Sequence, residues 1–295
     1  MHVGRASKFV ERDQFDAFVS RESIRFLKRH GNRPFFLLTS FLKPHDPFMP
    51  SERFARMFRP EDMKLPDTWG KVDLEHVPKE VRSSIENNGP TPELSDPNLA
   101  RRRMALYYAN LAEMDENLGR VLNALRELNL EKDTIVLYTA DHGEMLGEHG
   151  LWQKFMFYES SVRVPLIVRV PDLTPTGAQS QTPVSNTDVL PTLAELAGIP
   201  AIAGLDGKSF VSDLREPAKT RDTTVFSEYN LRNPRTKYMI RRGDWKLNYF
   251  THDISELFNL SEDPREMKNL AAVSAYKKVL EEMKAQLFQW YKPPE

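Results

Sequence analysis

The sequence of 295 residues contains no cysteine. This absence excludes disulfides, zinc–thiolate sites, iron–sulfur clusters and a cysteine nucleophile within the chain. No apolar run approaches the roughly 18 residues of a membrane span, and residues 1–10 lack the apolar core of a signal peptide. The 41 basic and 42 acidic residues give a formal net charge of −1, which provides no general attraction to nucleic acid or anionic membranes. We therefore expect a soluble chain with no signal peptide, no nucleic-acid partner and no membrane partner, in an unknown compartment.

The composition is that of a globular protein, with 40% hydrophobic and 28% charged residues. At this length we expect one large domain, or one large and one small domain. The hydrophobic pattern changes after about Gly204. The sequence therefore predicts an α/β core over residues 1–204 and a C-terminal α+β subdomain over residues 205–295.

The predicted core alternates helices with short apolar runs. Helical periodicity covers residues 13–30 and 99–128, and apolar runs that are typical of strands buried on both faces occupy residues 35–41, 134–139 and 164–170. Strands of this kind between helices indicate a mainly parallel α/β sheet that is covered by helices.

The predicted subdomain has a different pattern. Residues 225–229, 238–241 and 245–250 are short runs of mixed polarity, and Arg242-Gly243-Asp244 suits a tight connection between the last two. A helical pattern follows over residues 274–290. These features predict a small antiparallel sheet with one helix.

Two polar clusters follow predicted strands of the core. Lys43, His45 and Asp46 come after the run at 35–41, and Asp141-His142 comes after the run at 134–139. Ligands in open α/β sheets bind outside the carboxyl ends of the strands. Either cluster alone is more often a helix cap or a loop hydrogen bond.

The residue types of both clusters suit an anionic ester. Asp141 offers an anionic oxygen to a divalent cation, and His142 offers a nitrogen that either joins it or donates to an anion. Lys154 is a point charge suited to a sulfate or phosphate oxygen. His45 is a second donor or a general acid near neutral pH. Together these groups describe a site where negative charge develops on tetrahedral oxygens.

These motifs, in this order, strongly resemble the sulfatase family of the alkaline-phosphatase superfamily. The resemblance implies an alkaline-phosphatase-like α/β/α core with a small C-terminal antiparallel sheet and helix. It also implies hydrolysis of a sulfuric ester. The motifs that carry it are Phe35-Phe36-Leu37 with Lys43-Pro44-His45-Asp46-Pro47-Phe48, the segment Thr139–Lys154, Arg163-Val164-Pro165-Leu166-Ile167, Asp188–Ala194, Glu256–Pro264 and Asn269-Leu270-Ala271.

The resemblance also implies roles for single residues. Asp141 and His142 match half of the family's divalent-metal site, for which calcium is the first expectation and magnesium or manganese the alternatives. Lys154 matches the lysine that contacts the sulfate ester. His45 matches the histidine that contacts the sulfate or the leaving oxygen.

Two further residues are weaker candidates for substrate contact. His149 lies within the motif, where support of the loop is the favoured role. For Lys43, a solvated surface position is as good an interpretation as substrate contact. Arg101-Arg102-Arg103, at the start of the second long helix, is expected to form a solvated face.

The family's nucleophile is a formylglycine made from Cys or Ser in a Cys/Ser-x-Pro-Ser-Arg segment, and the 295 residues contain no such segment. The paired aspartates that complete the family's metal site are also not found. We therefore expect a truncated chain that starts partway through a sulfatase, lacks about the first third, and is inactive alone.

Three functions remain open from the sequence. The first is a sulfuric ester hydrolase acting on a small aryl, choline or sugar sulfate. The second is a phosphodiesterase or phosphonate monoester hydrolase of the same superfamily. The third is a non-catalytic remnant or binding module, whose partners would be an oligomer or a separately encoded N-terminal half.

Overall fold

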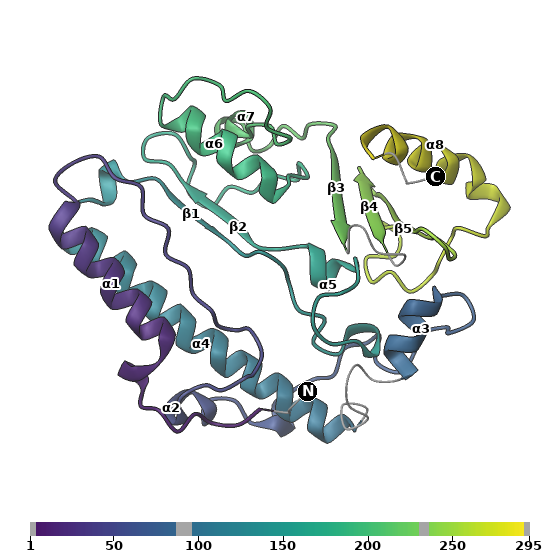
Figure 1. Cartoon of the computed structure of the whole chain (residues 1–295), viewed down its shortest axis with the longest axis horizontal. Coiled ribbons are helices and arrows are strands. Elements are labelled where there is room, and N and C mark those ends of the chain that lie inside the picture. The colour runs from purple at the N-terminus through teal and green to yellow at the C-terminus, as the bar shows by residue number, and fades with distance from the viewer. Residues whose placement is uncertain (1–3, 87–95, 230–235, 292–295) are drawn as a thin grey trace. The chain divides into compact units, whose positions relative to one another are not determined.

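A computed structural model describes residues 4–86, 96–229 and 236–291, which belong to two compact units (Figure 1). The first unit comprises residues 1–69 and 87–134, and the second comprises residues 70–86 and 135–295. Within the described ranges, no helix combines the length and apolar character that crossing a bilayer requires.

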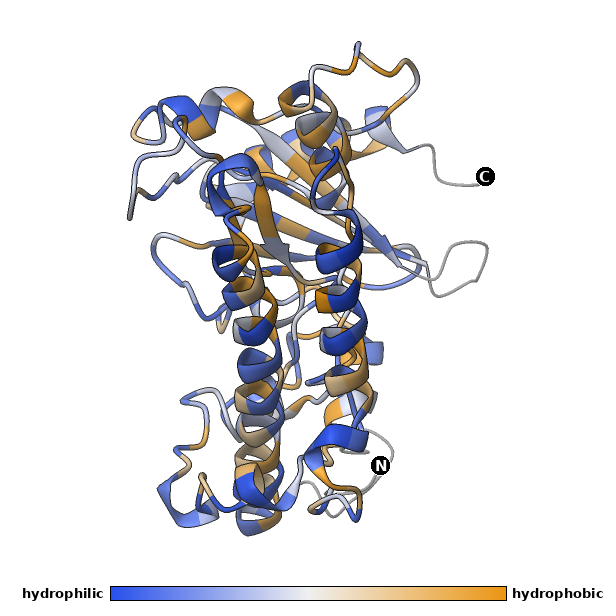
Figure 2. Ribbon diagram, turned by 90° about the vertical axis from the view of Figure 1, so that its left-hand side faces the viewer, coloured by the Kyte–Doolittle hydropathy of each residue, from blue (hydrophilic) through white to orange (hydrophobic). Residues whose placement is uncertain are grey.

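Two long helices build the first unit. They are α1 (Phe15–His30) and α4 (Pro97–Glu127), which lie side by side with hydrophobic positions interspersed among hydrophilic ones (Figure 2). Asp96 begins α4 by accepting a hydrogen bond from Asn98 N at 2.8 Å, and Pro97 occupies the first turn, where no N–H is needed. Ser20 Oγ donates to Asn117 O at 3.1 Å, which joins the two helices. Both helices were expected from periodicity, and both are confirmed.

The segment after α1 is extended but is not a strand. Residues 34–42 have no ladder partner among the described residues and are drawn as coil in Figure 1. Phe36 is 76% exposed and Leu38 is 77% exposed, while the alternate residues Phe35, Leu37, Thr39 and Phe41 are half-buried. The prediction of a strand buried on both faces is therefore wrong here. Burial on both faces requires neighbouring layers, which an apolar run does not itself supply.

The second unit contains a two-stranded sheet, β1 (Val136–Thr139) and β2 (Leu166–Arg169). The strands pair antiparallel, with Tyr138 opposite Ile167, so the predicted parallel arrangement does not hold for this pair. The connection folds back on itself instead of crossing over, because Gly143 N donates to Ser161 O and Met145 N donates to Gln153 O, both at 2.7 Å.

The C-terminal part of the second unit is the antiparallel sheet that the sequence predicts. Its order is β3 (Thr224–Tyr229), β4 (Lys237–Arg242), β5 (Trp245–Phe250) and β6 (Glu256–Asn259). Helix α8 (Lys277–Trp290) covers this sheet. Their shared core comprises Tyr238, Ile240, Leu247, Leu257, Leu270, Leu280, Met283 and Leu287.

Short elements complete both units. In the first unit they are α2 (Glu52–Ala55) and the 3-10 turns Glu11–Asp13, Pro60–Asp62 and Glu131–Asp133. In the second unit they are α3 (Lys79–Glu86), α5 (Glu159–Val162), α6 (Val189–Leu196), α7 (Val211–Arg215) and the 3-10 turns Glu148–Gly150, Asn186–Asp188 and Ser274–Tyr276.

Candidate functional site

Asp141 and His142 follow β1 after a single residue, Ala140, as the sequence predicts. Asp141 Oδ1 accepts a hydrogen bond from His142 N at 3.0 Å, and Asp141 Oδ2 lies 3.4 Å from His142 Nε2. His142 Nδ1 donates to Gly143 O at 2.8 Å, because a carbonyl oxygen can only accept. In the neutral ring this bond places the lone pair on Nε2, the atom nearest to the carboxylate. One anionic oxygen and one imidazole nitrogen are thus aimed at the same region.

Gly143 holds this pair against the segment that returns to β2. Its N–H donates to Ser161 O at 2.7 Å. A Cβ added at position 143 would lie 2.1 Å from Ser160 O, far inside van der Waals contact. Glycine is therefore required here by close backbone approach.

Lys154 is positioned by a closed loop between Gly143 and α5. Glu144 Oε1 accepts hydrogen bonds from Leu146 N at 3.3 Å and from Gln153 N at 2.6 Å. Gln153 has a φ of +69°, a conformation that a non-glycine residue rarely adopts without support. Ser161 Oγ donates to Lys154 O at 2.9 Å. These bonds fix the backbone on both sides of the lysine and leave its side chain half-buried.

His149 is buried in the same loop, with 4% exposure. Its ring stacks on Tyr158 with a centroid distance of 4.1 Å and an angle of 13°. Burial lowers the pKa of His149 to about 4, so the ring is neutral near pH 7.

A buried ionic cluster ties the segment after Lys154 to the C-terminal sheet. Tyr158 Oη donates to Glu256 Oε1 at 2.6 Å. Lys246 Nζ lies 2.9 Å from Glu159 Oε1 and 2.7 Å from Glu266 Oε1. The sequence does not reveal this cluster, since Lys246 alternates with apolar residues along β5 as a solvent-facing lysine does.

Burial and charge shift the pKa values of the cluster in different directions. Burial raises the pKa of Glu256 to about 7, against the hydrogen bond from Tyr158. Burial also raises the pKa of Glu266, because Lys246 only partly offsets it. Burial acts in the same direction on Glu159, but Lys246 and Arg241 outweigh it and lower its pKa. The cluster therefore holds both a firmly ionised carboxylate and one that gains a proton near neutrality.

His45 and Lys43 belong to the first unit. His45 is exposed, and its Nδ1 donates to Asp46 O at 2.6 Å. Lys43 Nζ pairs with Glu113 on α4, and the two side chains are 12% and 2% exposed. The alternative of a solvated surface lysine is therefore wrong for Lys43, because α4 supplies a buried carboxylate that the local sequence does not show.

Arg103 is another residue whose environment the sequence does not predict. It is fully buried, donates to Asp46 Oδ1 at 2.9 Å and lies over the Phe48 ring at 4.4 Å. A solvated face was expected for this arginine. The prediction fails at Arg103 because the carboxylate and the ring come from the loop that also carries His45.

Asp141 and His142 offer the kinds of ligand that a divalent cation accepts. Within residues 4–86, 96–229 and 236–291, no group of three or more histidines and acidic residues is arranged to hold a metal ion. The two residues therefore fit part of a metal site. Any further ligands would have to come from water, substrate or other protein groups.

The family model for sulfatases matches residues 6–199. The chain belongs to the sulfatase family. A second family model, for the C-terminal region of N-sulphoglucosamine sulphohydrolase, matches residues 147–292. The predicted family membership is confirmed.

Curated relatives carry sulfatase names. The chain is 34% identical over 278 residues to a choline-sulfatase of Rhizobium meliloti, covering 91% of this chain and 53% of the relative. It is 29% identical over 267 residues to an arylsulfatase of Clostridium perfringens, covering 88% of this chain and 54% of the relative. The sulfatase chain thus spans about half the length of the curated relatives it matches.

Solved structures agree with this sulfatase fold. A phosphonate monoester hydrolase of Agrobacterium radiobacter aligns with a TM-score of 0.85 at 28% identity, covering 96% of this chain and 62% of that chain. A protein solved with its substrate D-glucosamine-2-N,6-O-disulfate aligns with a TM-score of 0.78 at 26% identity, covering 94% of this chain and 69% of that chain. The predicted fold class is confirmed by these neighbours, whereas the β1–β2 pairing differs from expectation.

Proposed function

We propose that this chain carries part of the active site of a sulfuric ester hydrolase. The observation that carries the proposal is the approach of Asp141 Oδ2 to His142 Nε2, at 3.4 Å, just after β1 of a sulfatase-family chain. Asp141 and His142 would hold a divalent metal, with calcium as the first expectation and magnesium or manganese as alternatives. When bound, such an ion polarises an ester oxygen as a Lewis acid.

The other candidates act on the sulfate group. The ammonium of Lys154 neutralises charge on a sulfate oxygen, and the loop held by Glu144 fixes the backbone that carries it. His45 donates a hydrogen bond or a proton toward the sulfate or the leaving oxygen. His149, neutral and stacked on Tyr158, supports the loop, and direct substrate contact is its weaker proposed role. Lys43, paired with Glu113, is proposed only as a secondary substrate contact.

The proposed substrate is a small sulfate ester of the aryl, choline or sugar class. Relatives named choline-sulfatase and arylsulfatase, and a neighbour solved with a disulfated glucosamine, support that range. The phosphonate monoester hydrolase neighbour supports the alternative of a phosphate diester or phosphonate ester. A substrate panel on the full-length gene product separates the two, because a preference for phosphate diesters above about tenfold favours the alternative.

Metal binding tests the first element of the proposal. We expect saturable calcium binding by calorimetry, weak because a carboxylate and an imidazole supply few of the six to eight ligands that calcium prefers. Asp141→Asn should weaken it at least tenfold, and Glu216→Gln, at an exposed carboxylate on another segment, should not. Equal losses in both variants, or no saturable binding in the parent, would contradict the assignment.

Turnover tests the second element. The sequence contains no Cys/Ser-x-Pro-Ser-Arg segment, so no residue in it can become the covalent nucleophile of the family. We therefore propose that the 295-residue chain alone gives no detectable hydrolysis of 4-nitrophenyl sulfate with calcium or manganese. A robust rate would disprove this proposal.

We propose that a partner supplies the other half of the site. This partner is either a further subunit of an oligomer or a separately encoded N-terminal half. Sequencing the DNA immediately upstream of Met1 tests this point. An in-frame Cys/Ser-x-Pro-Ser-Arg segment there would restore a complete enzyme and dismiss the alternative of a non-catalytic remnant.

A further inference from the structure

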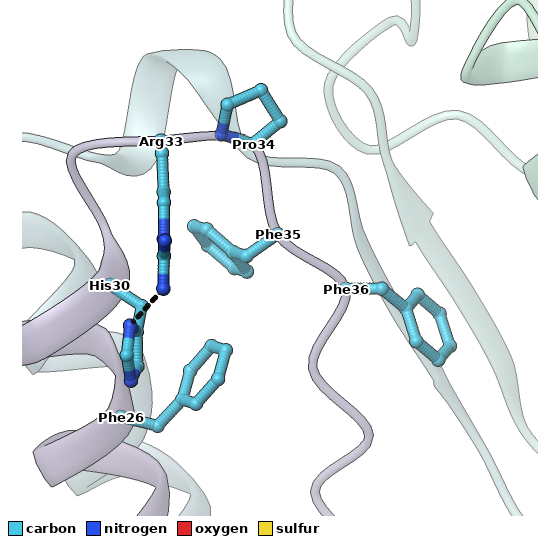
Figure 3. A pocket seen from close by; sticks show the side chains of 6 residues that line it. All are labelled: Phe26, His30, Arg33, Pro34, Phe35 and Phe36. Atoms are coloured by element: carbon cyan, nitrogen blue, oxygen red, sulfur yellow. Dashed lines mark hydrogen bonds between the residues drawn. The ribbon is translucent and has the colours of Figure 1, made fainter.

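The hollow at the carboxyl end of α1 is lined by side chains that contact one another. It has a volume of about 520 Å³, and its lining residues are Phe26, His30, Arg33, Pro34, Phe35 and Phe36 (Figure 3). The Phe26 and Phe35 rings meet nearly edge to face, with centroids 5.9 Å apart, and Arg33 Nη2 donates to His30 Nδ1 at 2.8 Å. Because these groups engage one another, the end of the helix itself accounts for their arrangement.

In the second unit, Ser161 is bonded to both segments of the candidate site. Its Oγ donates to Lys154 O at 2.9 Å, and its carbonyl oxygen accepts from Gly143 N at 2.7 Å. Gly143 follows His142 directly, and Lys154 is the proposed sulfate contact. One residue is therefore bonded to the backbone beside the Asp141–His142 pair and to the backbone of the lysine.

The surroundings of Ser161 are closely packed. The residue is 2% exposed and belongs to α5, a helix of four residues. A Cβ added at Gly143 would lie 2.1 Å from Ser160 O and 3.2 Å from Ser161 O, so the chain after His142 packs directly on the backbone of α5. A hydrogen bond from so buried a hydroxyl is stronger than one in water, because the local dielectric constant is low.

The amino end of α5 is anchored by the C-terminal part of the second unit. Glu159 N donates to Glu266 Oε2 at 2.6 Å. The Glu159 carboxylate lies 2.9 Å from Lys246 Nζ on β5 and 3.2 Å from Arg241 Nη1 on β4. Helix α5 is thus fixed at one end, while Ser161 near its other end contacts the site. The place of Ser161 is consequently set from outside the loop that carries Lys154.

The loop's own backbone bonds fix one side of Lys154. Met145 N donates to Gln153 O at 2.7 Å, which orients the peptide group that precedes the lysine. The hydroxyl of Ser161 orients the peptide group that follows it. Peptide groups are planar, so a residue whose two neighbouring groups are both held has a set φ and ψ and a set direction of its Cα–Cβ bond. Ser161 supplies the second of these two constraints.

We propose that Ser161 is a positioning residue, which sets the direction of the Lys154 side chain relative to Asp141 and His142. It acts through the backbone of the lysine, since its hydroxyl is bonded to Lys154 O. Its carbonyl bond to Gly143 N gives the lysine and the metal-ligand pair a common reference point. The assignment rests on the proposed function for the roles of Lys154, Asp141 and His142, and it adds the residue that relates them.

The carbonyl ¹³C chemical shift of Lys154, measured by NMR on the 295-residue chain, tests the bond itself. Ser161→Ala removes the donor, so this signal should move to lower frequency. The Gly143 N–H signal should change little, because its acceptor is a backbone oxygen that alanine retains. Ser161→Thr keeps a hydroxyl and should restore the parent value. Ser160→Ala removes a hydroxyl from the same helical turn and should leave the Lys154 signal unchanged.

Ligand affinities test whether the bond acts on the lysine. The probes are calcium alone, and inorganic sulfate in the presence of calcium, both titrated into the chain by calorimetry. Ser161→Ala should weaken sulfate binding about fivefold, the equivalent of one ordinary hydrogen bond, and should change calcium affinity less than twofold. Ser161→Thr and Ser160→Ala should stay within twofold of the parent for both probes.

The results separate the positioning role from the function on which it rests. A shifted Lys154 carbonyl signal with selective loss of sulfate affinity supports the role. An unchanged signal in Ser161→Ala would overturn it, and equal losses of calcium and sulfate affinity would reduce Ser161 to general support of the fold. If the parent binds sulfate no better than Lys154→Met does, the proposed function fails at this lysine, and the positioning role falls with it.

Discussion

Gly143 is the residue at which one added methyl group would disturb the candidate site most directly. An alanine Cβ would lie 2.1 Å from Ser160 O, and a backbone atom cannot yield as a flexible side chain does. We expect Gly143→Ala to lower the free energy of unfolding by about 2 kcal/mol, as measured by the urea midpoint.

Gly119 in α4 provides the matched control for this change. Apart from the adjacent residues and the backbone of the helix itself, no atom lies within 4 Å of a Cβ added there. Gly119→Ala should raise stability by about 0.5–1 kcal/mol, because alanine loses less conformational entropy in a helix. Similar effects of the two substitutions would contradict the close approach of residues 143 and 160.

Glu256 makes stability depend on pH. Its pKa is about 7 in the folded protein, above the ordinary value, so the folded state binds more protons than the unfolded state between about pH 4.5 and 7. This carboxyl therefore contributes stability at low pH, which is lost as the pH rises through about 7. Tyr158, Asn248, Lys246 and Glu266 are the polar groups that influence it.

Comparison of the parent with Glu256→Gln isolates this contribution. The parent should lose about 3 kcal/mol relative to the variant between pH 4.5 and 7.5, as measured by urea unfolding. His149, whose pKa of about 4 gives the opposite trend, is present in both proteins and cancels. Parallel stability curves would show that folding does not raise the pKa of Glu256.

At the scale of elements, Glu144 closes the loop that carries Lys154. Glu144→Ala leaves the N–H groups of Leu146 and Gln153 without this acceptor, which should cost about 1–3 kcal/mol. Amide hydrogen exchange at Gln153 should become faster. Glu144→Gln keeps an acceptor oxygen and should retain most of the protection. Equal exchange in both variants would show that the loop does not depend on this side chain.

The elements also differ in how much the sequence reveals of them. Helices α1 and α4 are predictable because their periodicity is local, and the C-terminal sheet is predictable because alternation and turns mark each strand. The burial of residues 35–41 is not predictable, since neighbours distant in the chain determine it. The approach of Asp141 to His142 follows from chain adjacency, whereas the partners of Lys43, Arg103 and Lys246 come from segments distant in sequence.

At the scale of the molecule, Lys246 joins the site-bearing segment to the C-terminal sheet within the second unit. It is fully buried between Glu159 and Glu266. Lys246→Met leaves the buried Glu266 without its cation and the half-buried Glu159 with Arg241 alone, and we expect a loss of about 3–5 kcal/mol. Lys278→Met removes an exposed lysine with a weak ion pair and should change stability by less than about 0.5 kcal/mol. Urea unfolding monitored by circular dichroism compares the two, and equal effects would contradict the ionic cluster.

The domain boundary proposed near residue 204 stays a prediction. The second unit includes residues on both sides of it, with Tyr158 bonded to Glu256. Separate expression of residues 205–295, followed by circular dichroism and thermal unfolding, tests whether the subdomain folds alone.

The discontinuous second unit has a consequence for the order in which the chain folds during synthesis. Lys237 bonds Glu80 of α3 across 157 residues, and Asp253 accepts from Lys79 N across 174 residues. At roughly 5–20 residues per second, α3 leaves the ribosome on the order of ten seconds before its partners. During that interval the first unit can acquire all of its own residues, up to Thr134, whereas Val81, buried in the finished core, is still without its neighbours from β5 and β6. The two units are therefore completed one after the other. The segment of residues 70–86, which lies in sequence between the two parts of the first unit, can pack only after the rest of the second unit has been synthesised.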